Sequence, residues 1–220
     1  WNGTLSDQQR VLYAPERSVR WVSLIPRLRT DQIMLIVHDN QNRLYAIPWN
    51  GTDFVSESSV NISTDTTSNT EQHFSFSWEE QSGEGLVIYN EGNNVLIKRY
   101  DPACPSGNCW DTNPNLTVPM GDNVDAVRSC SDPSSDHIGM IWQDDSGSAD
   151  VQVMVWNGSH NLSGRPTEAT DTEPNGAHNL NIDCAWIGES ALFGWVNDNA
   201  ISVSYLNFSK PNTWSASNMD

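Results

Sequence analysis

The tetrad Trp49-Asn50-Gly51-Thr52 decides the fold, because it recurs along the chain at a nearly constant distance. Trp1-Asn2-Gly3-Thr4 and Trp156-Asn157-Gly158-Ser159 are copies of it, and Tyr100-Asp101 and Tyr205 mark degenerate copies. The aromatic residues that begin these copies, here called anchors, are spaced 48, 51, 56 and 49 residues apart. A period of about 50 residues indicates a repeat architecture.

The segments between consecutive anchors follow the same order each time. An alternating segment such as residues 19–28 comes first, and a short apolar run such as residues 33–37 follows it. After a polar turn, a second alternating segment ends on the next anchor. Alternation is typical of a strand buried on one face, and a short apolar run of a strand buried on both. With a short fourth strand after the anchor, this order predicts an all-β, β-propeller-type array of four-stranded antiparallel blades. A β-sandwich with coincidental Trp spacing is the alternative.

The strand sets divide the chain into four blades and a leading strand. The predicted units are a leading strand at residues 1–16 and blades at residues 17–58, 74–118, 124–166 and 179–218. The leading segment has an anchor and a fourth strand but no first three strands. We therefore expect this orphan leading strand to complete a preceding blade or to add to a blade of a neighbouring molecule, where it would cover an exposed sheet edge.

A longer period is superimposed on the first. Trp49 and Trp156 are 107 residues apart, and Asp31 and Asp136 are 105 residues apart. Blades one and three are therefore closer relatives than adjacent blades are. The sequence therefore indicates that a pair of blades was duplicated as one unit. Such duplication is typical of a chain that derives from a long array of blades.

The net charge is strongly negative and unevenly distributed. The chain has 28 acidic and 11 basic residues, a formal net charge of −17. This excess of acid argues against nucleic acids and anionic membrane surfaces as partners, and no apolar run is long enough for membrane insertion. Residues 1–43 contain six arginines against four acidic residues, whereas residues 44–220 contain five basic against 24 acidic residues. The asymmetry is compatible with head-to-tail contact between copies; the alternative is that these arginines are merely solvated.

The four cysteines predict two disulfides. Cys104 and Cys109 bracket a turn of Pro, Ser, Gly and Asn that can bring the two thiols together, and no second Cys/His motif supports a metal site. Cys130 and Cys184 occupy the first strands of two successive blades, so a bridge between them is plausible; two buried free thiols are the alternative. Disulfides indicate an exported protein in an oxidising environment.

Seven Asn-x-Ser/Thr sequons accompany the cysteines. They lie at Asn2, Asn50, Asn61, Asn115, Asn157, Asn161 and Asn207. An Asn-Gly pair is also a hairpin signal by itself. Because the copy at residues 207–209 keeps the sequon and loses the Gly, we favour N-glycosylation, with the glycans on one common edge of the blades. The protein is thus expected to be extracellular or at the cell surface.

No pattern of catalytic or metal-ligating residues stands out. The five histidines lack metal-ligand spacing, and no nucleophile motif is present. The pairs Glu79-Glu80 and Asp144-Asp145 have the side chains that glycoside hydrolysis needs, but adjacent residues of a strand point to opposite faces. The loop 144–150 is only loosely similar to a calcium loop. We expect no catalytic residue and no cofactor, with calcium as a minor alternative.

At its anchors the chain resembles a family of extracellular propeller repeats in which a Trp-Asn-Gly-Ser/Thr element closes each blade. Such repeats occur in tandem in large secreted or surface proteins of bacteria and archaea. The chain is also distantly similar to six-bladed fucose-binding lectins, whose pockets use a recurring set of Arg, Glu and an aromatic residue. Here Arg20 and Arg128 lie in first strands, but no accompanying Glu recurs. The Ser-x-Asp-x-Gly-x-x-Trp box of sialidase-type propellers is missing from the sequence.

These observations predict a non-enzymatic, exported structural or adhesive surface glycoprotein. Its expected partners are copies of itself or further blades of the same array, joined head-to-tail, as in a filament built by addition of the N-terminal strand. The first alternative is a glycan-binding, lectin-like propeller with glycans as partners. The second alternative is a fragment of a glycoside-hydrolase propeller.

Overall fold

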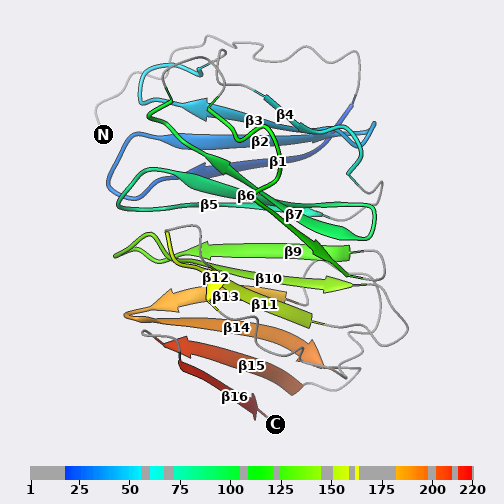
Figure 1. The fold of residues 1–220 in the computed structure, drawn as a ribbon, viewed down its shortest axis with the longest axis vertical. Coiled ribbons are helices and arrows are strands. Elements are labelled where there is room, and N and C mark those ends of the chain that lie inside the picture. Colours follow the sequence, from blue (N-terminus) through cyan, green and yellow to red (C-terminus); the bar gives the residue numbers. More distant parts are fainter. Residues whose placement is uncertain are drawn as a thin grey trace.

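The computed structural model describes residues 18–55, 60–66, 72–104, 109–120, 124–144, 151–158, 162–163, 182–197, 202–209 and 213–219. These residues form sixteen strands and no helix. The strands make four antiparallel sheets of four strands each, in sequence order. The sheets are stacked one below the other, with the first and the last at opposite ends of the stack (Figure 1). The predicted all-β architecture of four-stranded antiparallel sheets is confirmed.

Sheet 1 contains β1 (Val19–Pro26), β2 (Ile33–Asp39), β3 (Leu44–Trp49) and β4 (Val60–Ser63). Sheet 2 contains β5 (Phe74–Trp78), β6 (Gly85–Glu91), β7 (Asn94–Tyr100) and β8 (Leu116–Pro119). Sheet 3 contains β9 (Val124–Ser131), β10 (Ile138–Asp144), β11 (Val151–Trp156) and β12 (Leu162–Ser163). Sheet 4 contains β13 (Ile182–Ile187), β14 (Ser190–Asn197), β15 (Ser202–Ser209) and β16 (Thr213–Met219).

Consecutive sheets pack face to face because their central strands are apolar on both faces. In β6, Val87 and Tyr89 belong to the core between sheets 1 and 2. Leu86 and Ile88 of the same strand belong to the core between sheets 2 and 3. A third core, around Phe193, lies between sheets 3 and 4. The period-2 alternation of a strand thus supplies side chains to two different cores.

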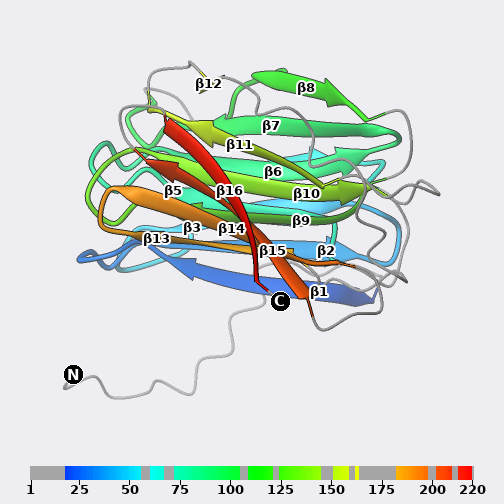
Figure 2. The same cartoon turned by 90° about the horizontal axis from the view of Figure 1, so that it is seen from below.

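The first strands of sheets 2, 3 and 4 lie beside one another, as they do in a propeller. β9 contacts both β5 and β13. Seen from below, the strands of sheet 4 run obliquely across those of the sheets behind it (Figure 2). The fourth strands β8 and β12 lie together on one outer side of the stack (Figure 2).

In sheets 1, 2 and 3 the third strand ends at the predicted anchor, but in sheet 4 the residue at this position differs from the predicted one. Trp49 and Tyr100 form bridges with Phe54 and Trp110, and the ring centroids of these pairs are 5.0 and 5.2 Å apart. In sheet 4 the residue in this position is Phe208, which pairs with Trp214, whereas Tyr205 lies in the middle of β15. The anchor assignment to Tyr205 was wrong, because the sequon there resembles the tetrad while the strand register places the equivalent position three residues later.

The end of the first blade also differs from the prediction. Its fourth strand, β4, begins at Val60, beyond the predicted boundary at residue 58. The residues after Trp49 form a tight turn instead, in which Asn50 Oδ1 accepts hydrogen bonds from the Thr52 and Asp53 amides (3.0 and 2.9 Å). The predicted leading strand, residues 1–16, lies outside the described residues.

Both predicted disulfides are present. Cys104 and Cys109 are bonded, with 5.2 Å between their Cα atoms. Cys130 of β9 and Cys184 of β13 are bonded, with 5.8 Å between their Cα atoms, and join sheets 3 and 4. The interpretations as a metal site or as free thiols are therefore wrong.

The contacts between sheets repeat with a period of two sheets. Trp78 of sheet 2 donates its indole N–H to the Ile25 carbonyl of sheet 1 (2.9 Å), and Trp186 of sheet 4 donates to the Cys130 carbonyl of sheet 3 (3.0 Å). Between sheets 2 and 3 the corresponding contact is different: the Ser129 hydroxyl bonds to those of Ser75 and Ser77 (each 2.8 Å). This pattern agrees with a duplication of blade pairs.

Candidate functional site

The outer face of sheet 1, which points away from sheet 2, exposes large apolar side chains along its first strand, β1, whereas Val37 of β2 and Ile47 of β3 on the same face are buried. Alternation along β1 turns Trp21 and Ile25 inward, where they pack against the first core. It turns Val22 and Leu24 outward, and these two side chains are 58% and 59% exposed. We call this surface, defined by Val22 and Leu24, the open face. Contiguous exposed apolar surface of this kind marks interaction sites more often than isolated apolar residues do.

Apolar side chains are also exposed on sheet 4, at the other end of the stack. In β13, Cys184 and Trp186 pack against the third core, so the intervening positions face outward. Ile187 is 70% exposed, and Leu192 of β14 is also exposed. Asp183 is an exposed acid on the same strand.

One edge of the stack is formed by the turns between first and second strands. Arg27 in the turn of sheet 1 donates to the Glu80 carbonyl of sheet 2 (2.9 Å). In the next pair of sheets, Asp136 Oδ1 accepts hydrogen bonds from the Gln81 and Ser82 amides (2.7 and 2.9 Å). We call this row of turns the turn edge. The polar contacts along it fix the spacing between successive sheets.

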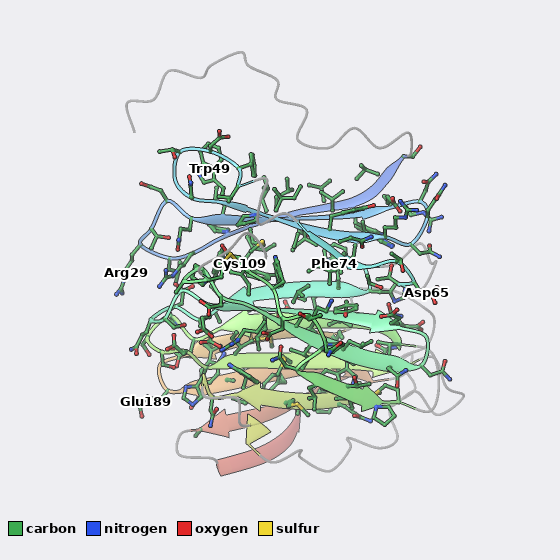
Figure 3. The ribbon with its side chains drawn as sticks, turned by 45° about the horizontal axis from the view of Figure 1, so that its top comes forward. Arg29, Trp49, Asp65, Phe74, Cys109 and Glu189 are labelled. Carbon is green, nitrogen blue, oxygen red and sulfur yellow. A yellow bond between two sulfur atoms is a disulfide. The ribbon has the colours of Figure 1, made fainter. Side chains whose placement is uncertain are left out.

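The two ends of the turn edge have opposite charges. Arg29 lies in the turn of sheet 1, and Glu189 lies in the turn of sheet 4; both are exposed. Figure 3 shows them on the same side of the molecule, at different levels of the stack. The charge asymmetry seen in the sequence therefore has a structural counterpart at this edge.

A buried carboxyl lies between sheets 2 and 3. Glu79 is 1% exposed and accepts hydrogen bonds from the Trp156 indole N–H (2.6 Å) and the Ser82 hydroxyl (2.9 Å). Burial raises the pKa of Glu79 to about 7, helped by the carboxylates of Glu84 and Asp136 and opposed by the two hydrogen bonds. The sequence did not indicate this site, because Trp156 is 77 residues away.

The neighbouring Glu80 contacts a different sheet. Its carboxylate accepts a hydrogen bond from the Leu28 amide of sheet 1 (3.1 Å), whereas Glu79 contacts Trp156 of sheet 3. The prediction that this acidic pair does not act together on one bond therefore agrees with the contacts.

The histidines within the described residues have structural partners. The ring of His38 bonds to the Thr66 hydroxyl (2.8 Å), and the ring of His73 bonds to the Val124 carbonyl (2.8 Å). Burial lowers the pKa of both rings, that of His73 to about 4, so both rings are neutral at pH 7. No cluster of three metal-ligating side chains is found among the residues that the structure describes. Residues 145–150 of the candidate calcium loop lie outside those residues.

Ser, His and Asp side chains do meet once, in the turn of sheet 3. The Ser135 hydroxyl lies 2.6 Å from Asp132 Oδ2 and 2.9 Å from His137 Nδ1. In a catalytic triad the His ring stands between the Asp and the Ser. Here the Ser stands between the other two, so the arrangement is that of a hydrogen-bonded turn.

The described sequons lie at several positions relative to the strands. Asn50 and Asn157 follow third strands, Asn61 lies on β4, and Asn115 directly precedes β8. Asn207 lies within β15. Asn2 and Asn161 lie outside the described residues. Because Asn207 precedes the anchor, its sequon is not a copy of the tetrad.

Three sequons are exposed and are expected to carry N-glycans when the protein is secreted from a glycosylating host. They are Asn50, Asn61 and Asn115. Peptide mass spectrometry after enzymatic deglycosylation in heavy-oxygen water should label these three positions. Thr52→Ala should remove the label at Asn50 and leave the other two. Unlabelled Asn50, Asn61 and Asn115 would contradict the prediction.

Comparisons with known proteins show the fold and no more. No protein-family model and no curated protein matches the chain. Its structure is similar to a subtype N10 neuraminidase-like protein of A/little yellow-shouldered bat/Guatemala/060/2010, with a TM-score of 0.52 and 11% identity over 92% of this chain and 58% of that one. It is also similar to the six-bladed β-propeller lectin of Aleuria aurantia, with a TM-score of 0.50 and 13% identity over 86% of this chain and 60% of that one. The chain thus spans about three-fifths of the length of these relatives. At these identities the comparisons establish a propeller-type fold.

Proposed function

We propose that the protein is a non-enzymatic, exported structural module that assembles head-to-tail, with the open face of one copy covered by the outer face of sheet 4 of another. The observation that carries this proposal is the exposure of Val22 and Leu24 on a sheet whose other face packs against sheet 2. Membership of the tandem extracellular propeller repeats, which the Trp-Asn-Gly tetrads resemble, is part of the same proposal.

The packing inside the chain provides the model for the contact between copies. Each internal sheet buries both of its faces against neighbouring sheets. If sheet 4 of a neighbouring copy lies on the open face, Val22 and Leu24 become buried against Ile187 and Leu192 of that copy in the same manner. Burying the exposed part of each apolar side chain stabilises the contact by about 1 kcal/mol.

Charge fixes the direction of this assembly. Continuing the turn edge from one copy to the next places the turn with Glu189 beside the turn with Arg29. Opposite charges favour this order, whereas two copies joined by the same end would bring like charges together. The proposal therefore specifies head-to-tail contact.

Several features support export. The two disulfides belong to an oxidising compartment, and three sequons are exposed. Within the described part of the chain, no helix has the length and apolar character needed to cross a membrane. Together with the repeat, these features support an extracellular or cell-surface glycoprotein.

The sequence left two alternative functions, glycoside hydrolysis and glycan binding, and the structure bears on each of them differently. The hydrolase alternative needs two carboxyls facing one bond, but Glu79 and Glu80 contact different sheets and Glu79 is buried. Glycan binding does not compete with assembly, because it would use a cavity between sheets 1 and 2, on the other side of sheet 1 from the open face.

Sedimentation velocity over a roughly hundredfold range of protein concentration tests the assembly. We expect concentration-dependent oligomers for the wild type. The double variant Val22→Asp/Leu24→Asp should weaken association at least about tenfold, since it removes about 2 kcal/mol of apolar burial and adds unpaired charge. Thr112→Asp, in the exposed loop before β8, is the matched control and should assemble like the wild type.

A charge swap tests the direction. Arg29→Glu and Glu189→Arg should each weaken association, and the two together should restore it. A wild type that is monomeric at every concentration, or a double Asp variant that assembles normally, would contradict the proposal. Failure of the swap alone to restore association would contradict the head-to-tail direction.

A further inference from the structure

An open pocket with a volume of about 300 Å³, here called the cavity, lies at the seam between sheets 1 and 2. Its wall includes Tyr89, Glu91 and Lys98 of the β6–β7 hairpin, Asn61 of β4, and Pro114. This volume is at the lower end of the range for small-molecule sites, about 300–1,000 Å³. The cavity is separate from the open face, which lies on the other side of sheet 1.

Strand alternation brings the three polar groups of sheet 2 to one face. Tyr89 belongs to the core between sheets 1 and 2, and Glu91 is two residues further along the same strand. On β7, Lys98 lies between Leu96 and Tyr100, which both belong to that core. Tyr89, Glu91 and Lys98 therefore face sheet 1. The fourth strand of sheet 1, β4, has only four residues and leaves this part of the face uncovered.

The other sheets have apolar residues where sheet 2 has Lys98. This position lies two residues before the anchor, and it holds Ile47 in sheet 1, Met154 in sheet 3 and, by register, Leu206 in sheet 4. Ile47 and Met154 are both buried. Lys98 is one of two lysines in the chain. Replacing a core residue by lysine in one repeat alone costs stability, which points to a role outside packing.

The contacts of Lys98 leave it able to bind a ligand. Its ammonium donates one hydrogen bond, to the Ile62 carbonyl of β4 (3.2 Å), and an ammonium has three N–H donors. Burial lowers the pKa of Lys98, while the carboxylates of Glu91 and Asp111 raise it. Glu91 supplies acceptors, and the Tyr89 hydroxyl can donate or accept.

We propose that this cavity binds a neutral, polyhydroxylated ligand of the size of one sugar unit. Hydroxyls of such a ligand would accept from Lys98 and donate to Glu91, since both residues line the cavity. One ammonium and one carboxylate cancel, so the cavity favours a neutral ligand over an ion of either sign. Pro114 supplies apolar surface for the C–H groups of the ring.

Saturation-transfer NMR tests this with galactose, fucose, mannose, glucose and N-acetylglucosamine as neutral probes, and with N-acetylneuraminate as the anionic probe. The protein is made without N-glycans, because Asn61 is a sequon and lines the cavity. We expect at least one neutral sugar to bind. Lys98→Met should weaken that binding at least about tenfold, since it removes a charged hydrogen-bond donor. Glu91→Gln should weaken it as well.

Lys98→Met is expected to fold, because Met154 fills the equivalent position of sheet 3. Lys210→Met, at the chain's other lysine, is the matched control and should bind like the wild type. Binding measured on Val22→Asp/Leu24→Asp keeps this question separate from assembly. No binding of any neutral sugar, binding of the anionic probe alone, or equal binding by Lys98→Met and the wild type would overturn the proposal.

Discussion

Replacing Cys130 and Cys184 together by Ala is expected to lower the free energy of unfolding by about 4 kcal/mol. The two residues are 54 positions apart, so the bond closes a long loop in the unfolded chain and removes much of its conformational entropy. In the folded protein the bond joins the first strands of sheets 3 and 4, beside the hydrogen bond from Trp186 to the Cys130 carbonyl (3.0 Å). Its loss should therefore loosen sheet 4 from the stack.

The second disulfide provides the matched control. Cys104 and Cys109 are five positions apart, so Cys104→Ala/Cys109→Ala should cost only about 2 kcal/mol by the same relation. Urea unfolding followed by tryptophan fluorescence measures both differences. Equal losses for the two pairs, or a greater loss for the short loop, would contradict the explanation by loop entropy.

Glu79→Gln is expected to stabilise the protein near pH 8 by about 2–3 kcal/mol and to have little effect near pH 5. The pKa of Glu79 is about 7 in the folded protein, and about 4.3 is normal for an exposed Glu. A group with a raised folded pKa binds its proton more tightly in the folded state. The stabilisation that proton binding at Glu79 gives the folded state is therefore complete below about pH 4 and is lost as the pH rises through 7. Gln keeps the acceptor for the Trp156 indole and carries no charge.

The difference between variant and wild type isolates this effect. The net charge of −17 also destabilises the protein as the pH rises, whereas the lowered pKa values of His38 and His73 destabilise it as the pH falls from about 6.5. Both effects are shared by the two proteins. Asp65→Asn, which removes one carboxylate from an exposed loop, is the matched control. A stability difference for Glu79→Gln that stays constant from about pH 5 to 8 would show that Glu79 is ionised throughout this range.

Most of the local structure follows from short-range patterns. Alternation and the short apolar runs predicted the first, second and third strands of every sheet, since strand burial has a period of two residues. The four cysteines predicted both disulfides. The sequon at Asn207 misplaced the last anchor, because a sequence motif does not determine which residues pair across a sheet, and hydrogen-bond register does.

The candidate sites depend on contacts between sheets. Glu79 meets Trp156 over 77 residues, and Lys98 of sheet 2 reaches the Ile62 carbonyl of sheet 1. No local pattern distinguishes these two residues from other polar residues near strand ends. Their environments arise only when one sheet is placed on the next.

The sequence alone predicted the repeat and the strand order within each sheet and favoured the observed pairing of the cysteines, because these depend on side-chain periodicity and on spacing along the chain. Only the tertiary structure decided which apolar side chains of sheet 1 stay exposed, where a carboxyl is buried and where a cavity remains. Those properties depend on how much of each face the neighbouring sheet covers, and coverage is set by the lengths and register of strands that are distant in sequence.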